Sequence, residues 1–308
     1  MGSHGNQKDH AAELSALASL KRIADATFNY EDARYVIFGV PFDYTSSYRR
    51  GSSKGPTEVR LAYDNLESFD LDYGVDFSEL PICDIGDISV NEDAAETVDL
   101  VEEVTKIIRN DEKIPIMIGG EHSITGGSIR NFRESSMIII DAHSDFRDSY
   151  MGNRNNHACV THRSLEVLGE GRIFSFGTRS TSKEEFEDPD YGKVTFIRSE
   201  YVKNNGIEKS FSEIAPKLKE SIYFSIDMDG IDPSQAPGVG TPEPYGLRDS
   251  DVRYLIRKLA RKIKGMILNN GHTQKVIPMK EIEHYIEDLG WEYVKDLGSK
   301  AIVKLPGN

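Results

Sequence analysis

Short apolar runs alternate with longer amphipathic stretches from residue 35 onward. Runs of strand length stand at 35–40, 114–118, 137–141, 172–176, 194–197 and 222–227. Several of them are apolar at nearly every position, which is typical of parallel strands covered by helices on both faces. The alternation predicts βαβ units with right-handed crossovers. We therefore expect a three-layer α/β/α domain around a central, mostly parallel sheet.

A helical period fills the gaps between these runs. Residues 94–110 show it most clearly, because their apolar positions recur every three or four residues. The side chains on that stripe are Leu100, Val101, Val104, Ile107 and Ile108. A further helix is predicted over 251–265. No internal repeat or low-complexity tract interrupts the pattern.

The chain divides into three predicted parts. Residues 1–34 form an N-terminal helical segment, 35–268 the α/β domain, and 269–308 a tail of different character. In the tail, a predicted helix with a C-capping glycine precedes two strand-like runs, "WEYVK" and "AIVKL", that predict a hairpin. The apolar helix positions and the capping glycine are Ile282, Tyr285, Ile286, Leu289 and Gly290.

Polar motifs follow three of the predicted strands. "GGEHS" follows 114–118, "AHSD" follows 137–141, and "DMDGIDP" ends the strand 222–227. In open parallel sheets, ligands bind beyond the carboxyl ends of the strands. These motifs therefore occupy the positions where a functional site is expected.

The stretch "DAHSD" places Asp141, His143 and Asp145 at alternate positions, so their side chains can point to one side. Two carboxylates and an imidazole that converge there are poorly accommodated without a cation. Taken alone, the motif is also compatible with a solvated loop of capping aspartates. Asp227 and Asp229 repeat the spacing at the end of the strand 222–227.

Two neighbouring features have simpler readings. Asp232 precedes Pro233, which favours a turn over a ligand. The glycines before Glu121 and His122 allow a close backbone approach, but a lone histidine is more often a core or loop residue than a ligand. Glu121 is either a partner of the His122 imidazole or part of a loop salt bridge.

The three strand ends together predict a metal centre. The candidate ligands are His122, Asp141, His143, Asp145, Asp227 and Asp229. Four carboxylates and two imidazoles suit two divalent ions about 3.5–4 Å apart, with bridging carboxylates. Oxygen-rich ligation with some imidazole favours Mn²⁺, with Mg²⁺, Co²⁺ or Fe²⁺ as alternatives. Such a pair ionises a shared water near neutral pH, so the predicted chemistry is hydrolysis.

The composition limits the chemical classes of binding partner and the location of the protein. With 37 Lys and Arg against 51 Asp and Glu, the formal charge is −14, which disfavours nucleic acid and suits metal cations or a small cationic substrate. The two cysteines, Cys83 and Cys159, provide no disulfide framework and favour a cytoplasmic location. No apolar window is long enough to span a membrane, and we expect no signal peptide.

Three segments resemble the signature motifs of a known family. "GGEHS", "DAHSD" and "SIDMDGIDPSQAPGVGTP" are similar to those of the ureohydrolases, the arginase–agmatinase family, and the likeness runs from about residue 35 to about 266. Residues 39–60, 147–160 and 176–187 look most like the agmatinase branch. The resemblance implies cleavage of agmatine to putrescine and urea in polyamine biosynthesis, two Mn²⁺ ions per subunit, and a homo-oligomer, either a trimer or a hexamer.

The resemblance also implies residue roles. Asp141 and Asp227 would bridge both ions. His122 and Asp145 would complete the ligands of one ion, and His143 and Asp229 would complete those of the other. Asp145 would also orient the bridging hydroxide, and His157 would contact the substrate and protonate the departing amine. Without the resemblance, His157 is compatible with an ordinary surface-loop histidine.

The end of the chain departs from the family pattern. Ureohydrolases close with a strand whose glutamate binds the substrate guanidinium; here "GMIL" begins such a strand, but the expected acids are absent. Glu281 and Glu283 fall in a predicted helix, so the guanidinium-binding glutamate is unassigned. Losing that charge-assisted contact would weaken substrate binding by a few kcal/mol, on the order of one bidentate ion pair.

Two other functions therefore stay open. One is a relative acting on another guanidino or formimino compound, such as guanidinobutyrate or formiminoglutamate. An acidic pocket wall would favour the amine of agmatine, whereas an arginine clamp would favour a carboxylate. The other is a non-catalytic metal-binding relative that lacks the guanidinium-binding glutamate.

Overall fold

The computed structural model describes residues 10, 13–14, 22–269, 292–296 and 301–304. The chain divides into two compact units, 1–273 and 274–308, which are described separately. The predicted boundaries after residues 34 and 268 stay predictions. The predicted helix around Tyr285, Glu281 and Glu283 lies outside the described residues, as does Gly290.

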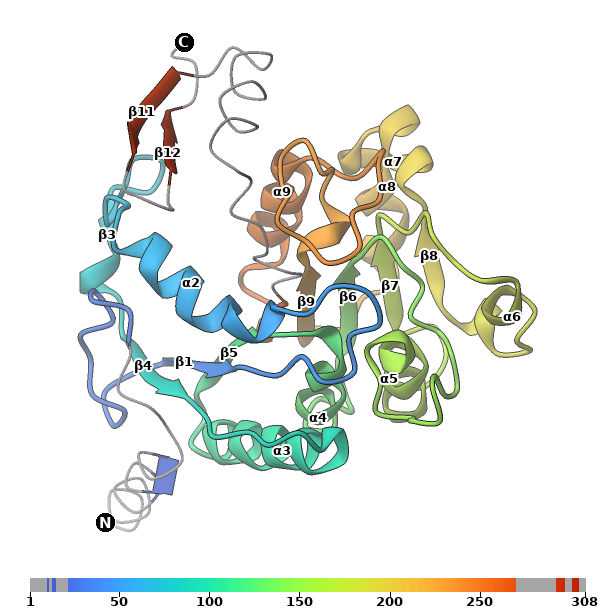
Figure 1. The fold of residues 1–308 in the computed structure, drawn as a ribbon, viewed down its shortest axis with the longest axis horizontal. Helices are drawn as coiled ribbons and strands as arrows, with labels where there is room; N and C mark the ends of the chain where they lie inside the picture. The colour runs from blue at the N-terminus through green and yellow to red at the C-terminus, as the bar shows by residue number, and fades with distance from the viewer. Residues whose placement is uncertain (1–9, 11–12, 15–21, 270–291, 297–300, 305–308) are drawn as a thin grey trace. The chain divides into compact units, whose positions relative to one another are not determined.

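Eight strands form one sheet in the order β4-β1-β5-β10-β9-β6-β7-β8, and every neighbouring pair is parallel (Figure 1). The strands are β1 (Tyr35–Val40), β4 (Ile82–Asp87), β5 (Ile114–Gly119), β6 (Ser136–Ile140), β7 (Ile173–Phe176), β8 (Thr195–Ile197), β9 (Ile222–Asp227) and β10 (Ile263–Asn269). A separate antiparallel pair joins β2 (Phe69–Asp70) and β3 (Val75–Asp76). The six runs predicted as strands all contribute to the large sheet.

The helices lie between the strands along the chain. The α-helices are α2 (Gly55–Tyr63), α3 (Ala94–Asn110), α4 (Thr125–Ile129), α5 (Val160–Leu168), α6 (Lys183–Phe186), α7 (Ser199–Asn205), α8 (Ile207–Ile214) and α9 (Asp249–Leu259). The 3₁₀ turns are η1 (Ser52–Lys54), η2 (Phe77–Glu79), η3 (His122–Ile124), η4 (His157–Cys159), η5 (Tyr191–Lys193), η6 (Ala215–Lys217) and η7 (Met228–Gly230).

One predicted boundary is wrong. The helix expected over 251–265 ends at Leu259, and Ile263 already pairs with Ile222 of β9. The reason is tertiary: from Ile263 onward the backbone pairs with β9, and from Met266 onward it also pairs with β5. This segment therefore continues as a strand.

The strands alternate their side chains between two covered faces. On β6, Met137 and Ile139 pack in one cluster with side chains of α3, α4 and α5, whereas Ile138 and Ile140 pack with those of α7, α8 and α9. Val59 and Tyr63 of α2 join a third cluster with strand residues of β1 and β5. Figure 1 shows α3, α4 and α5 on one side of the sheet and α7, α8 and α9 on the other. The three-layer α/β/α prediction is confirmed.

The strand that contains "GMIL" is β10, and it lies in the middle of the sheet. Its last residue, Asn269, pairs with Gly119 of β5 and Asp227 of β9. The carboxyl ends of β5, β9 and β6 are therefore gathered around the centre of one sheet edge. This is where the three polar motifs emerge.

The second unit contains β11 (Glu292–Asp296) and β12 (Ala301–Lys304), which pair antiparallel over the two runs predicted as a hairpin. Among the described residues, no helix combines the length and apolar character needed to cross a bilayer.

Candidate metal centre

Two close backbone approaches shape the strand ends that carry the motifs. An added Cβ on Gly120 would lie 2.0 Å from the carbonyl oxygen of Phe42, so only glycine lets the β5 end pass the β1 end. An added Cβ on Gly230 would lie 2.7 Å from the backbone nitrogen of Asp141. Both glycines therefore allow the loops after β1, β5, β6 and β9 to converge.

A first cluster surrounds the Nδ1 atom of His122. That nitrogen lies 3.0 Å from Asp141 Oδ2, 3.1 Å from Asp145 Oδ2 and 3.8 Å from Asp227 Oδ2. The Nδ1 atom can carry only one proton, and its hydrogen bond is to Asp145. Asp141 Oδ2 is therefore buried without a hydrogen-bond partner. A divalent cation among these oxygens would supply the missing partner.

A second cluster surrounds the Nδ1 atom of His143. It lies 3.2 Å from Asp229 Oδ2 and 3.6 Å from Asp141 Oδ1. The two oxygens of Asp141 thus face two different imidazoles, one in each cluster. A carboxylate placed in this way can bridge two cations.

The second ring nitrogen of each imidazole has a different neighbour. His122 Nε2 lies within hydrogen-bond distance of Ser225 Oγ, at 3.0 Å, whereas His143 Nε2 lies 3.8 Å from Glu243 Oε1, too far for a hydrogen bond. Metal-binding histidines usually have a hydrogen-bond partner on the second nitrogen, which selects the tautomer whose free nitrogen faces the ion. The Ser225 contact thus leaves Nδ1 of His122 available to a metal.

Electrostatics also favours a cation. Burial, reinforced by nearby carboxylates, raises the pKa of Asp227 well above its ordinary value and that of Asp145 to about 7. Burial alone would lower the pKa of His143, but Asp141 and Asp229 outweigh it and raise the pKa to about 12. Carboxylates that resist ionisation beside imidazoles that retain protons indicate a centre short of positive charge. Two divalent ions fit this donor set.

Asp145 has an uncommon backbone conformation. Its φ of 47° lies in the left-handed region, which costs a non-glycine residue on the order of 1 kcal/mol or more. The flanking residues hold it there, because Glu185 Oε1 accepts hydrogen bonds of 2.8 Å from both Ser144 Oγ and Phe146 N. The strain directs the Asp145 carboxylate toward His122.

His157 begins η4, where the Asn156 side chain accepts a hydrogen bond from Ala158 N. Its Nδ1 lies 3.4 Å from Thr45 Oγ1, and its Nε2 lies 3.5 Å from Ser47 Oγ. Burial lowers the pKa of His157 to about 4, so the imidazole is neutral at neutral pH. It lines the same cavity as the six candidate ligands.

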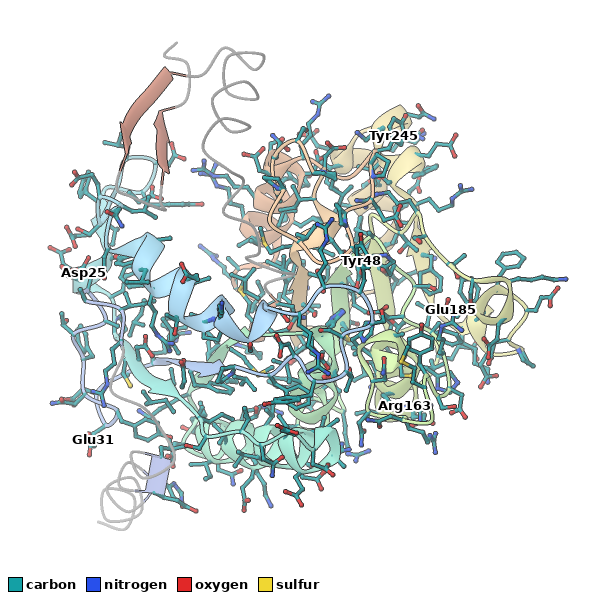
Figure 2. All side chains as sticks on the ribbon, in the orientation of Figure 1. Asp25, Glu31, Tyr48, Arg163, Glu185 and Tyr245 are labelled. Atoms are coloured by element: carbon teal, nitrogen blue, oxygen red, sulfur yellow. The ribbon has the colours of Figure 1, made fainter. Side chains whose placement is uncertain are left out.

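That cavity has a volume of about 360 Å³ and lies over the strand ends. Tyr48 and Glu185, both labelled in Figure 2, are among its lining residues and come from the β1–α2 loop and from α6. Asp232 binds Ser234 and Gly246 in a turn and does not line the cavity.

Sequence reasoning missed several groups around the site. Ser225, Glu185 and Thr45 all lie in segments that resemble the family, but no role was assigned to them, because each reaches the site through contacts distant in sequence. The sequence left two readings of Glu121 open, a partner of the His122 imidazole or part of a loop salt bridge. Glu121 binds Thr45, Ser46 and Ser123 instead, while Ser225 holds His122.

The sequence pattern of the Arginase family matches residues 33–268. The chain belongs to the arginase family. This family is metal-dependent, and the chain is a ureohydrolase, an enzyme that hydrolyses a guanidino C–N bond.

Individual relatives agree with this assignment. The N(1)-aminopropylagmatine ureohydrolase of Thermococcus kodakarensis is 42% identical over 235 residues, 75% of this chain and 80% of that protein. The agmatinase of Pyrococcus horikoshii is 36% identical over 240 residues, 77% of this chain and 83% of that protein.

A solved structure is similar as well. The agmatine ureohydrolase of Thermoplasma volcanium matches with a TM-score of 0.80 and 54% identity, covering 85% of this chain and 89% of that one. The expectation of an agmatinase-like ureohydrolase with the arginase fold is thus confirmed at the level of family and reaction class.

Proposed function

We propose that this ureohydrolase is a binuclear manganese enzyme that cleaves the guanidinium group of agmatine to putrescine and urea. The observation that carries the proposal is the position of Asp141, whose two oxygens face the Nδ1 atoms of His122 and His143. A single-ion site would not need one carboxylate between two imidazoles, each with further carboxylates of its own.

The chain would hold the two ions as the motifs predict. Asp141 and Asp227 would bridge them, His122 and Asp145 would complete one ion's ligands, and the remaining pair, His143 and Asp229, would complete the other's. Mn²⁺ suits this mixture of carboxylate and imidazole donors. Bound there, the pair supplies a water molecule that ionises near neutral pH.

Two side chains of this chain would direct the reaction. Asp145, fixed by its strained backbone, would accept a hydrogen bond from the nucleophile and aim it at the guanidinium carbon. His157, neutral at rest, would take up the proton that the attacking water loses and pass it to the amine that departs from that carbon, leaving urea and putrescine. His157 lines the cavity but belongs to neither cluster of candidate ligands, so it can contact the substrate.

The cavity charge supports a cationic substrate. Six carboxylates line the cavity, and two of them, Glu121 and Glu185, are not candidate ligands. The two lining arginines are already engaged: Arg49 lies over the ring of Tyr48, and Arg147 pairs with Glu184 at 2.6 Å. The cavity therefore favours the amine of agmatine over the carboxylate of guanidinobutyrate or formiminoglutamate.

A second candidate substrate is N(1)-aminopropylagmatine. The relative from Thermococcus kodakarensis supports it, and so does the cavity of about 360 Å³, which has room for a chain longer than agmatine. Both substrates carry the same guanidinium group and differ only in the length and charge of the distal amine. The reaction at the metal centre would be identical.

Urea release tests the proposal. The full chain is loaded with Mn²⁺, its metal content is measured, and urea is assayed with agmatine, N(1)-aminopropylagmatine and guanidinobutyrate. We expect two ions per chain and the highest kcat/KM with agmatine. A higher value with N(1)-aminopropylagmatine would assign the longer substrate instead.

A folded protein that binds two Mn²⁺ ions but releases no urea from any of the three would overturn the catalytic proposal. It would favour the non-catalytic alternative, in which the missing guanidinium-binding glutamate abolishes activity. Sedimentation of the same sample would test the predicted trimer or hexamer.

A further inference from the structure

Glu121 fastens the loop between β1 and α2 to the end of β5. Its carboxylate accepts hydrogen bonds from Thr45 N at 2.9 Å, Ser46 Oγ at 3.1 Å and Ser123 Oγ at 2.6 Å, and from the Thr45 hydroxyl. The side chain is buried, with 6% exposure, and an ionised carboxylate has no hydrogen to donate. Its oxygens therefore act only as acceptors in this network.

The direction of the Thr45 hydroxyl bond follows from this. A hydroxyl has one hydrogen and two lone pairs, and here the hydrogen points to Glu121. The Thr45 oxygen is left to accept hydrogen bonds from its other neighbours. Two nitrogen atoms of His157 lie near this oxygen, the backbone nitrogen at 3.1 Å and Nδ1 at 3.4 Å.

This arrangement determines the tautomer of His157. An acceptor beside Nδ1 selects the form with hydrogen on Nδ1, which leaves Nε2 unprotonated. On the Nε2 side, Ser47 Oγ lies 3.5 Å away and can donate to it. The ring of Tyr150 meets the imidazole edge-on, with centroids 6.2 Å apart, and limits its rotation.

We propose that Glu121 is a positioning residue that acts through Thr45 to hold His157 with Nδ1 protonated and Nε2 free in the cavity. The consequence for turnover rests on the proposed function, in which His157 carries the proton to the departing amine. Once Nε2 takes up a proton, the path from Nδ1 through the Thr45 oxygen to the Glu121 carboxylate stabilises the imidazolium. No proton needs to move along that path.

The tautomer can be measured directly by ¹⁵N NMR of histidine-labelled full chain loaded with diamagnetic Mg²⁺, without substrate. The signals of His157 are assigned by their absence in His157→Gln. We expect Nδ1–H in the wild type and in Thr45→Ser, which keeps the hydroxyl. In Thr45→Val, which removes it at similar volume, and in Glu121→Gln, whose amide can donate to the Thr45 oxygen, we expect a shift toward Nε2–H.

Kinetics with Mn²⁺ provides the second measurement. Thr45→Val is expected to lower kcat by about tenfold to a hundredfold, at or below the low end of the roughly 10²–10⁴-fold that general acid–base catalysis contributes, because His157 is misoriented but still present. KM should stay within about threefold and metal content should be unchanged. Thr45→Ser should recover most of that loss. Thr178→Val, which removes a buried hydroxyl bound to Ser175, is the matched control and should alter neither the tautomer nor kcat.

An Nε2–H tautomer in the wild type, or a Thr45→Val protein with unchanged tautomer and kcat, would overturn the proposal. If Thr45→Val does not fold, Glu121→Gln decides by the same spectrum. Because the tautomer is read without substrate, it is independent of urea release. An Nδ1–H signal in a chain that releases no urea would support the positioning role and overturn the proposed function alone.

Discussion

The Nε2 atom of His122 lies 3.0 Å from the hydroxyl oxygen of Ser225, on the side of the imidazole opposite the carboxylates. Both residues are buried, so water does not compete for this contact. The hydroxyl holds the ring with Nδ1 toward the predicted metal. Ser225 therefore links the interior of β9 to the end of β5.

Replacing Ser225 by alanine should weaken Mn²⁺ binding by about tenfold to a hundredfold, the usual effect of losing the partner of a metal-bound histidine. The measurement is calorimetric titration of the chelator-treated protein. Ser175→Ala, which removes a buried hydroxyl from β7, should bind Mn²⁺ like the wild type. Equal affinity in Ser225→Ala and wild type would show that the contact does not support the metal.

Asp141→Asn should remove both ions, because it alters the one carboxylate shared by the two clusters. Asp229→Asn should mainly affect the ion beside His143. Metal content after desalting distinguishes these outcomes, and urea release from Asp141→Asn should fall by at least about a thousandfold, since the ionised water is lost. Asp232→Asn, in the neighbouring turn, should retain two ions. Two tightly held ions in Asp141→Asn would contradict the bridging role.

Arg179 binds the loops behind the site with all three of its guanidinium nitrogens. In the described part of the chain it forms no ion pair, and burial lowers its pKa. Its acceptors are the backbone oxygens of Gly177, Asp229, Gly230, Glu243 and Pro244, at 2.7–3.3 Å.

A lysine cannot reproduce this planar fork, so Arg179→Lys should leave some of these carbonyls without a donor. We expect a loss of about 1–3 kcal/mol in the free energy of unfolding and weaker Mn²⁺ binding on the Asp229 side. Denaturant unfolding and metal titration measure the two effects. Arg172→Lys, at an exposed arginine bound to one carbonyl, should change neither. Wild-type stability in Arg179→Lys would refute the prediction.

His157 should make the protein less stable in acid. Burial lowers its pKa from about 6.5 to about 4, so between these values the unfolded chain binds a proton that the folded chain does not. Stability is therefore lost as the pH falls from about 6.5 to about 4, by up to about 1.4 kcal/mol per unit of pKa difference. His157→Gln lacks this contribution, so its unfolding free energy should decrease less between pH 7.5 and pH 4.5. Parallel pH dependence in the two proteins would contradict the lowered pKa.

Local pattern was sufficient where the structure depends on neighbours in sequence. The stripe through Val101, Val104 and Ile108 predicted α3, and all three side chains are buried against the sheet. β4 escaped detection because Asp84 and Asp87 interrupt its apolar run. Arg60 of α2 compensates them, with two hydrogen bonds of 2.7 and 2.9 Å to Asp84 and a further ion pair to Asp87. That partner is 24 residues away in sequence and invisible to periodicity.

The sequence by itself determined which acids and histidines stand at the ends of parallel strands, because side-chain alternation and the strand-end rule operate over a few residues. Only the tertiary structure decided what each of them touches. Thr45 and His157 are 112 residues apart, yet the Thr45 hydroxyl accepts a hydrogen bond from the His157 backbone nitrogen. Ser225 on β9 meets His122 at the end of β5, with the strand β10 between them. Hydrogen bonds act over about 3 Å of space whatever the separation along the chain, so such partners appear only when the chain has folded.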